Sequence, residues 1–237
     1  MTLTGKTALV TGGSRGIGRA IVERLAAAGA RVVFTYRDNA AAAGEVTAKV
    51  PGTVAVRADQ EDLGNLAAMF APVRDGLDIL VNNAALVSAM PIEKLEEEDI
   101  DRAYLVNVKF PLLAIREAVP LLRDGGRIVN ISTLNTVAPA PGLALYCSTK
   151  GALEQITAVA AKELGPRGIT VNTVSPGATD TDLLRGVNPP EALERAAETT
   201  ALRRLGRPAD VAAVVAFLAS PDGGWVTGQN IRATGGL

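Results

Sequence analysis

The sequence contains no histidine and a single cysteine, Cys147. Zinc sites built on histidine or cysteine ligands, histidine-based catalytic triads and intrachain disulfides are therefore excluded. Acid–base chemistry has to use tyrosine, lysine, aspartate, glutamate or the one thiol. An excess of charge is missing too, because 24 basic and 25 acidic residues leave a formal net charge of -1. Such a balance provides no broad field for nucleic acid or an anionic membrane.

Long apolar runs are also absent. The best candidate, residues 77–90, is interrupted by Asp78, Asn82 and Asn83, so we expect no membrane-spanning segment. Residues 1–6 lack a basic region followed by an apolar stretch, which argues against a secretory signal. A lone cysteine suits a reducing compartment, and we expect a cytoplasmic protein without a metal site.

The chain does have the length for a sizeable core, with 237 residues of which 48% are hydrophobic. Short apolar runs typical of strands alternate with longer helical patterns. Strands are expected at residues 6–11, 31–36, 53–57, 79–82, 127–131, 170–175 and 230–233. Helices are expected at residues 17–28, 40–50, 62–74, 97–122, 146–164 and 209–219.

This alternation predicts βαβ units and therefore an α/β fold. Right-handed crossovers favour a doubly wound parallel sheet of the Rossmann type, with about seven strands and helices on both faces. No linker divides the sequence, so we expect one domain over residues 1–237. Residues 183–200 are interpreted as a small helical lid and not as a domain boundary.

A glycine-rich segment, residues 11–18 (TGGSRGIG), joins the first expected strand to the first expected helix. Glycines let the backbone turn tightly and approach a phosphate, whose charge meets the positive end of the helix. The spacing is G-x-x-x-G-x-G and not the usual G-x-G-x-x-G fingerprint. Its position between a strand and a helix favours dinucleotide binding over an ordinary turn.

The second expected strand ends at Tyr36-Arg37, where an NAD site usually has an acidic residue. Arg15 stands in the glycine-rich segment. Two guanidinium groups that converge on one point would hold a 2′-phosphate by charge-assisted hydrogen bonds, which favours NADP(H) as the cofactor. The alternative is a pair of solvated surface arginines.

Tyr146 and Lys150 are four residues apart in an expected helix, so they lie on one face, one turn apart. An ammonium beside a phenol favours the phenolate and lowers the pKa of the phenol, which lets tyrosine act as a general acid or base. The alternative is a helix whose lysine extends to solvent.

With these residues in place, the sequence resembles the short-chain dehydrogenase/reductase family over essentially its full length. The matching motifs are residues 11–18, Asp59, Asn82-Asn83-Ala84, Asn107, Tyr146-x-x-x-Lys150, Pro176-Gly177 with Thr181, and the tail 227–236. The resemblance implies reversible hydride transfer between NAD(P)H and a carbonyl or alcohol substrate.

The resemblance also implies roles for individual residues. Tyr146 would protonate the carbonyl oxygen, and Lys150 would lower the pKa of Tyr146 and hold the nicotinamide ribose. Asn107 would anchor a water that relays protons to Lys150. Asp59 would meet the adenine, Asn83 the adenosine side and Thr181 the carboxamide; for Asn83 and Asn107 the alternative is satisfaction of backbone groups. The implied cofactor-binding set is Gly12, Ser14, Arg15, Gly16, Ile17, Gly18, Tyr36, Arg37, Asp59, Gln60, Asn83, Ala84, Ala85, Tyr146, Lys150, Pro176, Gly177, Thr179 and Thr181.

The main departure from the family is at its catalytic serine, thirteen residues before the tyrosine, where this chain has Thr133 beside Ser132. Side chains alternate along a strand, so only one of the two can reach the substrate, and the spacing favours Thr133. Its methyl group stiffens the side chain and narrows the pocket. Smaller departures are Ala85, where the family usually has glycine, and Pro72 in a short helix.

The leading hypothesis is an NADPH-dependent ketoreductase or alcohol dehydrogenase. A dehydratase, epimerase or lyase on the same fold is an alternative, and so is a non-catalytic dinucleotide-sensing or partner subunit. The expected pocket segments, residues 86–90, 134–143 and 183–200, are mostly apolar and suit a carbon-rich carbonyl compound. We also expect a homotetramer, since Ala152, Ile156, Val159 and Ala160 offer a small apolar helix surface, unless they face the core of the chain itself.

Overall fold

The computed structural model describes residues 2–237. Its strands are β1 (Thr7–Val10), β2 (Arg31–Tyr36), β3 (Val54–Arg57), β4 (Leu77–Asn82), β5 (Leu122–Ile131), β6 (Thr170–Pro176) and β7 (Asn230–Ala233). Its α-helices are α1 (Gly16–Ala27), α2 (Ala40–Lys49), α3 (Asn65–Phe70), α4 (Glu97–Tyr104), α5 (Phe110–Ala118), α6 (Ala144–Leu164), α7 (Asp182–Val187), α8 (Pro190–Thr199) and α9 (Pro208–Ala219).

The strands form one seven-stranded sheet in the order β3-β2-β1-β4-β5-β6-β7, and every neighbouring pair is parallel. The predicted doubly wound parallel sheet is therefore confirmed. The winding reverses between β1 and β4, so the loops after these two strands diverge and leave a crevice at the carboxyl edge. Both the glycine-rich segment and Asn83 lie at this edge.

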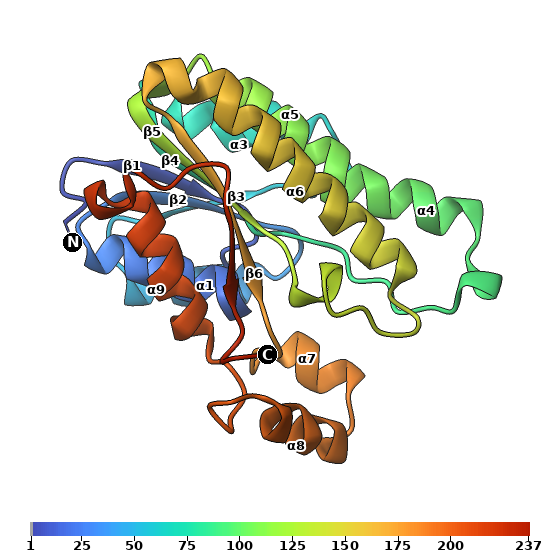
Figure 1. Ribbon diagram of the computed structural model, residues 1–237. Helices are drawn as coiled ribbons and strands as arrows, with labels where there is room; N and C mark the ends of the chain where they lie inside the picture. Colours follow the sequence, from blue (N-terminus) through green and yellow to red (C-terminus); the bar gives the residue numbers. More distant parts are fainter. Residues whose placement is uncertain (1) are drawn as a thin grey trace.

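Helices cover both faces of the sheet (Figure 1). Because side chains alternate along β1, Ala8 and Val10 belong to the core beneath α1 and α9, whereas Leu9 belongs to the core beneath α3, α5 and α6. Every residue of β4 is buried, as expected for a central parallel strand. Two apolar cores, one on each face, thus support the sheet that carries the residues at its carboxyl edge.

The helix expected at residues 97–122 is interrupted and shorter than predicted. It consists of α4, a π-helical turn over Leu105–Lys109 and α5, which ends at Ala118. Leu122 already pairs with Leu77, so β5 begins five residues before the expected residue 127. The apolar residues 119–122 suit a helix or a strand, and the pairing with β4 decides between them.

Two further segments differ in detail from the sequence prediction. The helix expected at residues 62–74 is reduced to α3 and a 3₁₀ turn over Ala71–Val73, since Pro72 supplies no backbone N–H. The expected lid at residues 183–200 is present as α7 and α8. Figure 1 shows both helices below the sheet, next to the carboxyl end of β6.

Within residues 2–237, no helix is both long and apolar enough to cross a membrane. The same described part of the chain holds no cluster of three or more histidine, cysteine, aspartate or glutamate side chains arranged to bind a metal ion.

Candidate active site

The glycine-rich segment forms a tight loop at the amino end of α1. Gly12 has a φ of +67°, a left-handed conformation that a side chain would strain. A Cβ atom on Gly18 would collide with the carbonyl oxygen of Gly12, so the first turn of α1 can approach the loop only because residue 18 is glycine. Ser14 is buried and Arg15 is exposed. Backbone N–H groups at the start of the helix are thereby presented at the crevice.

Asn83 holds this loop in place. Its Nδ2 donates to the carbonyl oxygens of Thr11 (2.9 Å) and Gly12 (3.2 Å). In return, the Thr11 hydroxyl accepts from the backbone N–H groups of Asn83 and Ala84, each at 3.0 Å. The contacts found for the Asn83 amide are thus to the backbone, which is the structural alternative considered above. Ala84 and the exposed Ala85 follow at the same edge of the sheet.

Arg37 directly follows β2, and Arg15 directly precedes α1. Arg37 donates to the Asp38 carboxylate at 3.1 Å, and its guanidinium, followed by the more distant charge of Arg15, lowers the pKa of Asp38. Arg37 also lies 3.8 Å from the Glu61 carboxylate, which in turn pairs with Arg102 at 2.7 Å. The charges of Arg37 and Arg15 thus both reach the Asp38 carboxylate, while Arg37 itself is paired with Asp38 and Glu61. Their convergence on a 2′-phosphate stays a prediction.

The residues after β3 lie in a second part of the crevice. The Asp59 carboxylate accepts from the backbone N–H of Glu61 at 3.0 Å. Gln60 is only 6% exposed, and neither polar atom of its amide has a hydrogen-bond partner among the described residues. Ala58 donates its N–H to the carbonyl oxygen of the half-buried Tyr36, which ties the ends of β2 and β3 together.

Tyr146 and Lys150 occupy successive turns of α6. The Lys150 ammonium is 5.8 Å from the centroid of the Tyr146 ring and donates to the carbonyl oxygen of Ile131 at 2.8 Å. Lys150 is only 2% exposed, so the carbonyl at the end of β5 compensates part of the cost of burying its charge. The spacing seen in the sequence therefore places both groups against the carboxyl end of β5.

Burial controls the protonation of both groups. It raises the pKa of Tyr146 to about 12, and a hydrogen bond with Thr133 offsets part of this effect. It lowers the pKa of Lys150 to about 8, against the opposite influence of the Glu154 charge. In this structure the Lys150 ammonium donates to Ile131 and does not contribute to the pKa of Tyr146, which burial raises. The lowering of the phenol pKa that the sequence predicts is therefore absent from this arrangement.

Ser132 and Thr133 point in different directions at the end of β5. The Thr133 hydroxyl is near enough to the Tyr146 phenol to lower its pKa, and it donates to Oδ1 of Asn135 at 3.0 Å. The Ser132 hydroxyl donates instead to the Glu154 carboxylate at 2.5 Å. The alternation of side chains thus brings Thr133, and not Ser132, to the tyrosine.

Asn107 lies in the π-helical turn between α4 and α5 and is 1% exposed. Its Oδ1 accepts from the N–H of Leu86, and its Nδ2 donates to the carbonyl oxygen of Leu86, both at 2.8 Å. Nδ2 also donates to the Thr149 hydroxyl at 3.1 Å. Asn107 in the π turn thus ties the backbone of Leu86 to Thr149 of α6.

The end of β6 closes the crevice opposite α6. Pro176 is the last residue of the strand, Gly177 donates its N–H to Ala233, and the Thr179 hydroxyl donates to Gly177. Thr181 caps α7 by accepting from Leu184 N–H at 3.2 Å. A Cβ atom on Gly16 would lie 3.4 Å from the Thr181 methyl group. The start of the lid therefore rests against the glycine-rich loop.

The contacts reveal three polar residues that the sequence reasoning did not single out: Asn135, Thr136 and Glu154. The amide oxygen of Asn135 accepts a hydrogen bond from the Thr133 hydroxyl, and the Thr136 hydroxyl donates to Glu154 at 2.9 Å. Glu154 was detectable in principle, because it continues the i, i+4 row of Tyr146 and Lys150. Nothing in the sequence marks Asn135, whose contact depends on the turn after β5.

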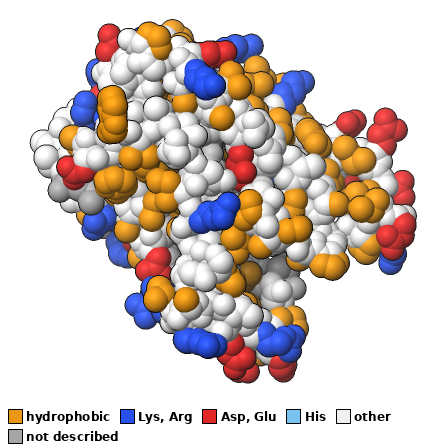
Figure 2. Space-filling view, in the orientation of Figure 1, with side chains coloured by type: hydrophobic (Ala, Val, Ile, Leu, Met, Phe, Trp, Pro, Cys, Tyr) orange, Lys and Arg blue, Asp and Glu red, His pale blue; other side chains and the backbone are white. Residues whose placement is uncertain are grey.

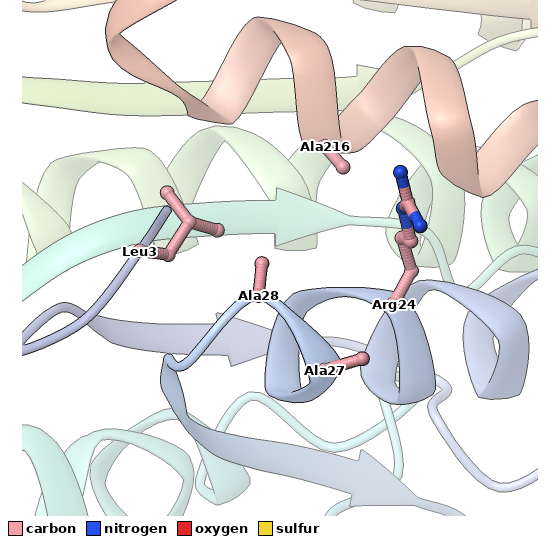
Figure 3. A pocket seen from close by; sticks show the side chains of 5 residues that line it. All are labelled: Leu3, Arg24, Ala27, Ala28 and Ala216. Atoms are coloured by element: carbon pink, nitrogen blue, oxygen red, sulfur yellow. The ribbon is translucent and has the colours of Figure 1, made fainter. Parts of the chain in front are cut away.

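One small cavity lies at the opposite end of the molecule. It measures about 170 Å³ and is lined by Leu3, Arg24, Ala27, Ala28 and Ala216, between the end of α1 and α9 (Figure 3). Arg24 is its one ionisable side chain, and no predicted site residue lines it. The chemistry-bearing residues therefore gather at the carboxyl edge of the sheet and not in this cavity.

Comparison with known proteins agrees with this geometry. The family model described as enoyl-(acyl carrier protein) reductase matches residues 12–237. The short chain dehydrogenase/reductase AacuN of Aspergillus aculeatus is 37% identical, over 99% of this chain and 96% of its own. The angucycline C-6 ketoreductase LanV with bound NADP has a TM-score of 0.94 and 41% identity, covering 99% of this chain and 96% of that one. The reductase LugOII, which catalyses keto-reduction at C1 during lugdunomycin biosynthesis, has a TM-score of 0.94 and 44% identity, covering 100% and 98%.

Proposed function

Because the chain belongs to the short-chain dehydrogenase/reductase family, we propose that it is an NADPH-dependent ketoreductase. The observation that carries this proposal is the cluster of Tyr146, Lys150 and Thr133 at the carboxyl edge of the sheet. A non-catalytic sensor would not need a hydroxyl, a phenol and a buried ammonium held together. A dehydratase or epimerase remains an alternative that shares these residues.

The protonation states favour the reductive direction. With a pKa of about 12, Tyr146 carries its proton at neutral pH and can donate it to a carbonyl oxygen that is becoming negative. Thr133 can turn its hydroxyl from Asn135 to the same oxygen and donate a second hydrogen bond. Lys150, with a pKa of about 8, is mostly charged below that pH and stabilises the negative charge that develops nearby. The bound nicotinamide would supply the hydride.

The residues at the crevice fit a dinucleotide. The loop at Gly12 and the amino end of α1 present N–H groups to a pyrophosphate, since no side chain obstructs them. Lys150 can turn toward ribose hydroxyls, and the unpartnered Gln60 amide lies beside Asp59 on the adenine side. LanV, which has bound NADP, shares this fold at 41% identity.

Cofactor preference follows from the two arginines. We expect NADPH to bind more tightly than NADH, and Arg37→Asp to narrow or reverse the difference, because a carboxylate there repels a 2′-phosphate and can accept from ribose hydroxyls. Calorimetric titration of both dinucleotides measures the effect. Arg31→Asp is the matched control, since Arg31 lies at the other end of β2. Equal affinities of the wild type for the two cofactors would contradict the role of the arginines.

The surroundings of Tyr146 favour an apolar substrate. Residues 86–90 and 134–143 are joined by a hydrogen bond from Met90 N–H to the Gly142 carbonyl oxygen. Val137 and Leu183 are about half exposed, and Arg185 is paired with Asp180. We therefore propose a carbon-rich carbonyl compound as the substrate, and the keto-reductions named for LanV and LugOII support a ketone.

The reaction itself is tested by following NADPH absorbance with a panel of carbonyl compounds. The panel should contain fused-ring aromatic ketones, quinones, acyclic β-keto esters and small aldehydes. We expect the larger apolar ketones of the panel to be consumed fastest, with one equivalent of alcohol formed for each NADPH oxidised. Tight NADPH binding without turnover of any member of the panel would favour the sensor alternative.

We also propose a homotetramer. Of the four helix residues named in the sequence, Ala160 is buried in the chain's own core, whereas Val159 is 54% exposed. Leu112 of α5 is likewise 46% exposed, and Trp225 is 98% exposed on the segment before β7. Figure 2 shows apolar side chains among charged ones on the visible face of the molecule. Apolar surface of this kind is typical of contacts between copies.

Light scattering tests this assembly. The wild type should have about four times the chain mass of 24.4 kDa at micromolar concentration. Val159→Glu should reduce the mass, because it places an unpaired charge in an apolar contact. Lys49→Ala should not, because α2 packs against the other face of the sheet. A monomeric wild type would refute the proposal.

A further inference from the structure

Glu154 connects three elements of the site. It lies on α6, one turn after Lys150, and its carboxylate accepts from the Ser132 hydroxyl at 2.5 Å and the Thr136 hydroxyl at 2.9 Å. Ser132 follows the end of β5, and Thr136 belongs to the 3₁₀ turn Leu134–Thr136. Hydrogen bonds to a charged acceptor are stronger than neutral ones, so the carboxylate fastens this segment to the helix that carries Tyr146.

Thr133 lies inside the segment that Glu154 holds. The residue before it and the residue three after it both donate to the carboxylate. The Thr136 hydroxyl also lies 3.1 Å from the Thr133 carbonyl oxygen. A shift of the segment would therefore move the Thr133 hydroxyl relative to the Tyr146 phenol, and displacements of this kind are costly in a site that depends on geometry.

Glu154 also supplies charge to the interior. Lys150 is 2% exposed, and its pKa is lowered by burial and raised in part by the Glu154 charge. The other ionisable groups next to Lys150 on α6 are Tyr146 and Cys147. Among the elements packed against α6, the π-helical turn carries the exposed Lys109, and the last residues of β5 and β6 carry no charge. The charged side chains of α4 are exposed except for the half-buried Asp99; they are Glu97, Glu98, Asp99, Asp101 and Arg102.

We propose that Glu154 is a positioning residue, which holds the Thr133 segment against α6 and provides the counter-charge for the buried Lys150. Only the predicted effect of Glu154 on kcat rests on the proposed reductase activity. Its two contributions are separable, because a glutamine at position 154 can keep the hydrogen bonds with the two hydroxyls but not the charge.

The effect of the Glu154 charge on Lys150 can be measured without enzymatic turnover. Lysine labelled with ¹³C at Cε is titrated by NMR in the whole protein, and the Lys150 signal is assigned as the one lost in Lys150→Arg. Glu154→Gln should move the Lys150 transition to a pH about one unit lower. Glu163→Gln is the control, because it removes the charge of an exposed glutamate on the same helix, and it should leave the pH of the Lys150 transition unchanged. An unmoved transition in Glu154→Gln would overturn the counter-charge, even if the chain proved to have no reductase activity.

The positioning is tested by the pH profile of kcat. In the wild type, reduction should decline as the pH rises through the Lys150 transition, and in Glu154→Gln this decline should begin at lower pH with kcat nearly retained in acid. Glu154→Ala should lose about 10- to 100-fold in kcat at every pH, with the NADPH dissociation constant unchanged. Glu154→Asp should recover part of that loss. Folding of each variant is checked by its melting temperature, and full activity of a folded Glu154→Ala would overturn the positioning role.

Discussion

Tyr146→Phe should lose nearly all turnover while binding NADPH as tightly as the wild type. The substitution removes the phenol proton in the first turn of α6 and keeps the buried aromatic ring. Loss of a single preorganised donor typically lowers kcat by about 10²–10³, or roughly 3–4 kcal/mol, and loss of the acid itself costs more. Steady-state kinetics with the best ketone of the panel measure the loss, and calorimetry measures NADPH binding.

Tyr104→Phe provides the control, since Tyr104 is a half-exposed phenol at the end of α4. It should behave as the wild type in both measurements. If Tyr146→Phe kept more than a tenth of the wild-type kcat, the phenol would not be the acid. A loss of NADPH binding together with turnover would instead show that Tyr146 holds the cofactor.

Thr133→Ala should have the second largest effect. Its hydroxyl interacts with the Tyr146 phenol, whereas the neighbouring hydroxyl of Ser132 donates to Glu154. We expect kcat to fall by about 10²–10³, the usual cost of one missing donor to a developing oxyanion. Thr133→Ser restores the hydroxyl without the methyl group and should retain activity, with a gain on bulky ketones because the pocket is wider.

Ser132→Ala is the matched comparison on the neighbouring position. Glu154 keeps its contact with Thr136 in that variant, so kcat should fall by only a few-fold. The assignment of roles in this strand would be wrong if Ser132→Ala were inactive and Thr133→Ala fully active.

The structure explains why the order of elements was predictable and two boundaries were not. Local hydrophobic periodicity predicts strands and helices, and it was sufficient to predict all seven strands of the sheet and the helical segment at residues 183–200. The apolar residues 119–122 carry no such preference, and only the pairing of Leu122 with Leu77 makes them part of β5. The π turn at Asn107 is likewise invisible locally, since it depends on the contact of that side chain with Leu86.

The pKa of Tyr146 also depends on the tertiary structure and not on the local sequence. From the sequence, Lys150 appears one turn from Tyr146 and should lower the pKa of the phenol. In the folded chain both groups are desolvated, and the pKa of Tyr146 rises to about 12 instead. Desolvation depends on every element packed around a group, so a motif of five residues contains no information about it.

The sequence by itself determined the α/β class, the glycine-rich loop, the pair of arginines and the register that favours Thr133 over Ser132, because each depends on spacing within one segment. The tertiary structure alone decided that Asn83 holds the loop, that Asn107 ties Leu86 to α6 and that the Gln60 amide is buried. It also decided that Glu154 joins α6 to the end of β5. These contacts link residues far apart in the chain, and only the packing of the parallel sheet brings them together.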